Sequence, residues 1–106
     1  MNQQDMAEAP EIIREFLGYL QTVKGKSPKT VQEYYLDLRT FFRYIKRKRG
    51  MVPETTPFEE IKIDDVNLEL IKTISLTQVY EYMNFLSTER GNKAATRSRK
   101  VSSLRT

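Results

Sequence analysis

Hydrophobic residues recur at intervals of three and four along several segments of this chain, and each such segment is predicted to be an amphipathic helix. In the first segment, residues 10–23, the apolar face consists of Ile12, Ile13, Phe16, Leu17, Leu20 and Val23. Pro10 suits a first helical position, because its φ is already fixed and it has no N–H to leave unpaired. Gly25 is the predicted stop signal.

The second segment, residues 28–49, has the longest pattern. Its apolar stripe consists of Val31, Tyr34, Tyr35, Leu38, Phe41, Phe42 and Ile45. Ser27 is the predicted N-cap, and Pro28 occupies the first turn. Cations near a helix C-terminus stabilise the helix dipole by about 0.3–1 kcal/mol each. We therefore attribute the basic cluster Arg43–Arg49 to that structural role, with DNA contact as the alternative.

Two further helices are predicted in the second half of the chain. One covers residues 76–88, where Ser75 and Gln78 have the spacing of a capping box, and Ile74 and Val79 that of a hydrophobic staple. The other covers residues 93–105, with a thin apolar seam and five cations. Its pattern reaches Thr106 without a stop signal, so we expect the sequence to be part of a longer protein.

The remaining segments are expected to be irregular. Residues 1–9 are polar and acidic, and we predict a disordered tail there. Residues 51–74 form an acidic connection with short helical turns near 57–61 and 67–72, or alternatively a β-pair near 61–66. With four main helices and no convincing strand pattern, the fold class is all-α. The predicted core contains Phe16, Leu20, Tyr35, Leu38, Phe42, Met83 and Leu86.

Composition excludes several classes of function. The 106 residues include no Cys and no His, which excludes disulfides, zinc fingers and cysteine nucleophiles, and we expect no cofactor and no metal. The four glycines stand singly, so no phosphate-binding glycine loop is present. The sequence shows neither a secretory signal nor an apolar run near the roughly 20 residues that span a bilayer. A cytoplasmic protein without a membrane partner is expected.

Charge is segregated along the chain. Residues 1–50 carry a net charge of +4, residues 51–89 carry −6 and residues 90–106 carry +6. Separate basic segments suit a polyanionic partner, although solvated helix faces would account for the charges equally well.

The order of these segments resembles a known domain. Residues 25–42, GKSPKTVQEYYLDLRTFF, resemble the opening signature of the core-binding, SAM-like N-terminal domain of tyrosine recombinases, the phage-integrase family. Residues 92–105, NKAATRSRKVSSLR, resemble the last helix of that domain, and residues 75–86 its third helix. The resemblance covers roughly residues 10–106. It implies a four-helix SAM-like bundle that clamps one side of double-stranded DNA.

The resemblance also implies what this chain lacks. In the family a separate C-terminal domain, with catalytic histidines and a tyrosine nucleophile, cuts and rejoins DNA strands. We expect that domain to be absent here, so the chain has no catalytic residue and is not itself an enzyme. Its implied partners are DNA and other protomers of the full-length recombinase, and the isolated chain is expected to be monomeric.

The candidate DNA contacts fall at two helices. They are Lys26, Ser27, Lys29, Thr30, Tyr34, Lys93, Thr96, Arg97, Arg99 and Lys100. The first four lie at a helix N-terminus, where the helix dipole favours an anion. The Tyr34 ring is expected to pack against the core with its hydroxyl at the DNA-facing rim, or alternatively to be a core residue alone. The last five belong to the cationic helix 93–105.

Two other functions compete with DNA binding. The acidic segment 51–74 and the SAM-like shape would also suit a helical protein–protein interaction module with a basic partner. A small metal enzyme built on Asp and Glu is the third hypothesis, which the absence of a clustered carboxylate motif disfavours.

Overall fold

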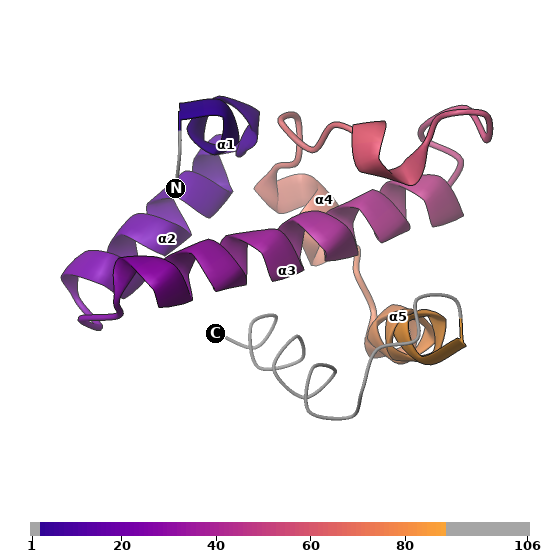
Figure 1. Ribbon diagram of the computed structural model, residues 1–106. Coiled ribbons are helices and arrows are strands. Elements are labelled where there is room, and N and C mark those ends of the chain that lie inside the picture. Colours follow the sequence, from indigo (N-terminus) through magenta and orange to yellow (C-terminus); the bar gives the residue numbers. More distant parts are fainter. Residues whose placement is uncertain (1–2, 89–106) are drawn as a thin grey trace.

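The computed structural model describes residues 3–88, and within this range the chain is helical and has no strand. Its elements are α1 (Gln3–Glu8), α2 (Glu11–Thr22), α3 (Pro28–Lys48), the 3-10 helix η1 (Phe58–Glu60), α4 (Leu68–Lys72) and α5 (Leu76–Thr88). Figure 1 shows α3 as a long central helix, with α1 and α2 on one side of it and α5 on the other. The predicted all-α class is confirmed, while the helix predicted over 93–105 lies outside the described residues.

Helices α2 and α3 form a hairpin that holds the first part of the core. α2 buries Ile13, Leu17 and Leu20, which follow one another at intervals of three and four residues, and α3 packs against that face. Both helices begin and end within one residue of the predicted positions, and Pro10 is the N-cap of α2. All seven predicted core residues belong to one cluster, in which Phe16 and Met83 are half-buried and the others are buried.

Aromatic side chains join the second half of α3 to α5. The ring centroids of Phe41 and Tyr82 lie 5.0 Å apart with their planes nearly perpendicular, and those of Tyr44 and Phe85 lie 4.9 Å apart. Phe58 of η1 extends this cluster, with its centroid 6.0 Å from that of Phe85. These separations are in the range that favours aromatic pairs, so ring packing contributes to the attachment of α5 to α3.

The predicted capping box at the start of α5 is confirmed. The Gln78 N–H donates to the Ser75 hydroxyl at 3.2 Å, and the Ser75 N–H donates to the Gln78 side-chain oxygen at 3.1 Å. Two backbone donors that a helix start leaves unpaired are thereby satisfied reciprocally.

The acidic connection between α3 and α5 lies against the bundle. Its two predicted helical turns are present as η1 and α4, and no strand forms between residues 61 and 66. Ile61, Ile63 and Val66 are buried, so this segment contributes apolar side chains to the molecule's interior. The alternative of a β-pair was therefore wrong.

The structure differs from the sequence-based expectation at the N-terminus. Residues 1–9 were predicted to be a disordered tail, but Gln3–Glu8 form helix α1. Asp5 is buried and accepts a hydrogen bond from the Gln32 side chain at 2.9 Å. The Arg14 guanidinium donates to the carbonyls of Met6 and Ala9, at 3.2 and 3.0 Å, and thereby satisfies the end of the helix. The partners of α1 come from α2 and α3, so the local sequence did not reveal them.

Candidate nucleic-acid interface

The turn between α2 and α3 brings four of the predicted DNA contacts together. Gly25 has a φ of +66°, and the following N–H, that of Lys26, donates to the Leu20 carbonyl at 3.0 Å. This is the left-handed helix ending that favours glycine. Lys26, Ser27 and Lys29 are exposed at the start of α3, and Thr30 is half-buried beside them.

The start of α3 is capped from within the chain. The Ser27 hydroxyl accepts from the Thr30 N–H at 3.2 Å and donates to the Thr30 hydroxyl at 3.0 Å. Pro28 has no N–H to offer. The backbone donors at this helix end are therefore partly used, and an anion would depend more on the lysines and on the helix dipole than on free N–H groups.

The lysine side chains at this turn point to solvent. Lys26 and Lys29 are exposed, and among the described residues neither forms an ion pair. Lys24 shares these properties and was missed by the sequence analysis. Its position next to Gly25, one residue from Lys26, was the available signal. The turn thus carries three cations within six residues that have no ion-pair partner between residues 3 and 88.

Tyr34 lies one turn further along α3. Its side chain is half-buried and packs against the core cluster. Both readings given above, a core residue and a residue whose hydroxyl reaches the rim, agree with this placement. Its contact with DNA stays a prediction.

The basic residues at the other end of α3 have a different role. Arg43 donates through Nε to the Ile61 carbonyl at 2.9 Å, and Arg47 donates to the Thr56 carbonyl. Lys46 is buried, donates to the Lys62 carbonyl at 2.7 Å and pairs with Asp65. These cations fasten the acidic connection to α3, a role that was not predicted in addition to their interaction with the helix dipole.

Arg49 continues the same arrangement toward α5. Its guanidinium donates to the Thr73 hydroxyl and carbonyl, at 2.6 and 3.1 Å, and to the Gln78 side chain at 2.8 Å. Burial lowers the pKa of Arg43, and the nearby Arg39 adds to this effect. Even so, a guanidinium stays charged at neutral pH. Arg43, Lys46 and Arg47 bind backbone carbonyls, which leave no pattern in the sequence, and the acceptors of Arg49 lie 24 and 29 residues away.

Acidic side chains face solvent on the connection. The exposed carboxylates in this stretch are those of Glu54, Glu59, Glu60, Asp64, Asp65 and Glu69. The turn between α2 and α3 is therefore basic, while the connection is acidic.

Between residues 3 and 88 no group of three or more carboxylates is placed to hold a metal ion, and no helix there is long and apolar enough to span a membrane.

Five predicted contacts, Lys93, Thr96, Arg97, Arg99 and Lys100, lie outside the described residues. Their role stays a prediction from the sequence.

Comparisons with known proteins place the chain among integrase domains. Residues 13–66 match the family described as the phage integrase, N-terminal SAM-like domain. The chain is also similar to the tyrosine recombinase XerC of Caldanaerobacter subterraneus subsp. tengcongensis, with 47% identity over 96 residues. That similarity covers 91% of this chain and 27% of the relative, so the chain spans about a quarter of the relative's length. No solved structure gives a significant match.

Proposed function

Because the chain belongs to the family of phage-integrase N-terminal SAM-like domains, we propose that it binds double-stranded DNA as the N-terminal domain of a site-specific tyrosine recombinase. In this role it clamps the recombination-site duplex, while a C-terminal domain cuts and rejoins strands together with other protomers. The similar recombinase is several times longer than this chain, which leaves room for such a domain. The chain itself is proposed to contribute binding and no catalytic residue.

The proposal rests on the position of the family match along the chain. Residues 13–66 include nearly all of α2, the turn with Lys24, Lys26 and Lys29, and all of α3. Lysines that form no ion pair are the groups that neutralise phosphates and release counterions from DNA. Near the C-terminus of α3, Arg43, Lys46 and Arg47 are engaged within the protein, which leaves the turn as the better candidate among the described residues.

The expected binding is weak and driven by phosphate contacts, because a single domain contacts one side of the duplex. Non-specific binding of this kind has a Kd of about 10⁻⁴–10⁻⁶ M at physiological salt. Nanomolar, sequence-selective binding by this chain would contradict the expectation.

The test is a titration of the 106-residue chain with labelled duplex DNA over a salt series. Each lost phosphate contact lowers the slope of log K against log salt by about 0.9. The double substitution Lys26→Gln and Lys29→Gln should therefore reduce the slope by about 1.8 if both residues contact phosphates.

The matched control is the double substitution Lys62→Gln and Lys72→Gln. It removes the same charge from two exposed lysines in the acidic connection, and should leave the slope unchanged apart from a small general effect. Equal losses in the two variants would show that the turn is not a contact site. No binding by the unaltered chain would favour the protein-interaction module, with the exposed carboxylates of residues 54–69 as its surface.

A further inference from the structure

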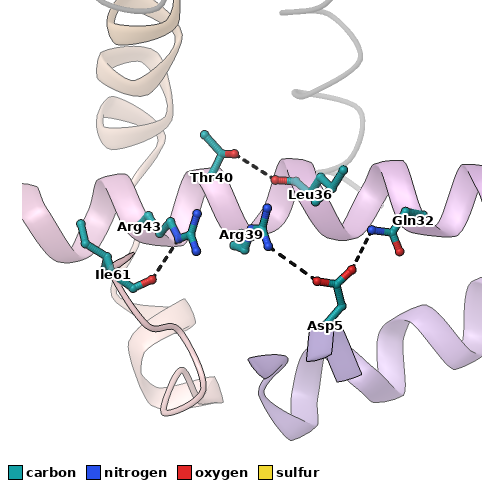
Figure 2. Close-up of polar contacts among 7 residues, drawn as sticks. All are labelled: Asp5, Gln32, Leu36, Arg39, Thr40, Arg43 and Ile61. Atoms are coloured by element: carbon teal, nitrogen blue, oxygen red, sulfur yellow. Dashed lines mark hydrogen bonds and ion pairs between the residues drawn. The ribbon is translucent and has the colours of Figure 1, made fainter. Parts of the chain in front are cut away.

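Arg39, in the middle of α3, is half-buried and is not one of the cations that bind the acidic connection. Arg39 lies against α1, where its guanidinium is 3.7 Å from the Asp5 carboxylate, and its side chain is 24% exposed. The same guanidinium lies over the Tyr35 ring, 5.6 Å from the ring centroid. Figure 2 shows Asp5 reaching up from α1 between Gln32 and Arg39.

Arg39 is held loosely compared with the other arginines of α3. A charge-assisted hydrogen bond between nitrogen and oxygen is about 2.7–2.9 Å long, so the separation of 3.7 Å from Asp5 is an ion pair without a close hydrogen bond. Its Nε is buried and has no hydrogen-bond partner in the structure. A guanidinium has five donors arranged to hold two oxygens of one phosphate. Arg39 therefore has donor capacity that Asp5 does not use.

Arg39 shares one side of α3 with one lysine of the turn, Lys29. Lys29, Gln32, Leu36, Arg39 and Arg43 follow one another at intervals of three or four residues and so share one side of α3. Lys29 and Leu36 are exposed on this side. Ten residues separate Lys29 from Arg39, which is about 15 Å along a helix axis.

Helix α1 covers part of this side of α3 with a short acidic segment. It has six residues, and isolated helices shorter than about 12–15 residues are marginal in water. Its carboxylates, those of Asp5 and Glu8, lie near Arg39 and Arg43. Release of α1 would remove two negative charges from this side of α3. The support that the Tyr35 ring gives to Arg39 would remain.

We propose that Arg39 is a further DNA-phosphate contact and that α1 is an acidic cover which DNA displaces from it. This inference rests on the proposed DNA-binding function. The cover and the DNA compete for the same guanidinium, so Asp5 weakens binding in the free protein and α1 leaves α3 in the complex. The contact surface ends near Arg43, since the groove beyond it is also lined by Glu59, Glu60 and Asp64.

The test compares Asp5→Asn with Glu15→Gln in the 106-residue chain. Both remove one negative charge, but Glu15 is exposed on α2 and forms no ion pair in the described part of the chain. Duplex titration over about 50–200 mM salt should show that Asp5→Asn binds about two- to fivefold more tightly than Glu15→Gln. In an Arg39→Gln background that advantage should disappear, because the competed group is absent.

A second measurement needs no substitution. On addition of duplex DNA to the unaltered chain, the NMR signals of residues 5–9 should shift and their amide hydrogens should exchange faster. Equal affinities of Asp5→Asn and Glu15→Gln, or residue 5–9 signals that DNA leaves unchanged, would overturn the cover while leaving the proposed function intact. No DNA binding by any of these proteins would overturn both.

Discussion

Lys46 offers a direct test of how the acidic connection is attached. Its side chain is buried, and its ammonium donates to the Lys62 carbonyl at 2.7 Å and pairs with Asp65. The substitution Lys46→Met keeps most of the buried aliphatic stem and removes the charged donor. The Lys62 carbonyl then loses its partner.

The expected loss can be worked out from these contacts. A hydrogen bond to a charged group contributes about 1.5–3 kcal/mol. The Asp65 side chain is 69% exposed, so water replaces the ammonium there and its share is at most about 1 kcal/mol. Removal of a buried charge also relieves a desolvation cost, which offsets part of the loss. We expect Lys46→Met to lower the free energy of unfolding by about 2 kcal/mol.

The assay is urea unfolding followed by circular dichroism, with the free energy obtained by linear extrapolation. Lys48→Met is the matched control, since Lys48 is exposed in the same last turn of α3. Both substitutions remove one cation from the helix C-terminus, so their effects on the helix dipole are similar. A Lys46→Met protein as stable as Lys48→Met, or more stable, would show that these contacts do not hold the connection in place.

The remaining predictions concern the core and the DNA surface. Leu38→Ala should lower the free energy of unfolding by about 2–5 kcal/mol, because Leu38 is buried between the helices, and an unchanged thermal melt would remove it from the core. Among the described residues the buried Tyr35 hydroxyl has no hydrogen-bond partner, so Tyr35→Phe should be neutral or stabilising in urea unfolding. Burial raises the pKa of Tyr35 above its ordinary value of 10.0. The tyrosine therefore ionises in the unfolded chain at a lower pH than in the folded protein, and the free energy of unfolding falls as the pH rises above 10.0. Tyr35→Phe should reduce this fall. In DNA titrations, Lys100→Ala should weaken binding to all sequences and lower the salt slope by about 0.9, whereas Arg97→Ala should cost about 1–3 kcal/mol on the cognate site if it reads guanine.

The sequence predicted the parts of the fold that depend on local patterns. The helices over residues 10–23, 28–49 and 76–88 were found because their apolar faces repeat every three or four residues, and both hydrogen bonds of the capping box at Ser75 and Gln78 are present. Helix α1 was missed because Asp5 meets Gln32, 27 residues away, and no local pattern encodes that contact.

The same limit applies to the candidate site. Ser27 and Thr30 were predicted correctly to lie together at a helix start, because capping is a local property. The role of Arg43, Lys46 and Arg47 was missed because they bind backbone carbonyls of a distant segment, and a carbonyl has no signature in the sequence.

The attachment of the connection through the side chains of α3 has a consequence for the order of folding. The hairpin of α2 and α3 is made from neighbouring segments, so closing it involves a short loop and little entropy. The contacts of Arg49 with Thr73 and Gln78 close loops of 24 and 29 residues, which form more slowly. We expect the hairpin to be structured in the folding transition state and the connection to attach afterwards. Substitutions in the hairpin core should then slow folding, whereas substitutions at Lys46 or Arg49 should mainly speed unfolding.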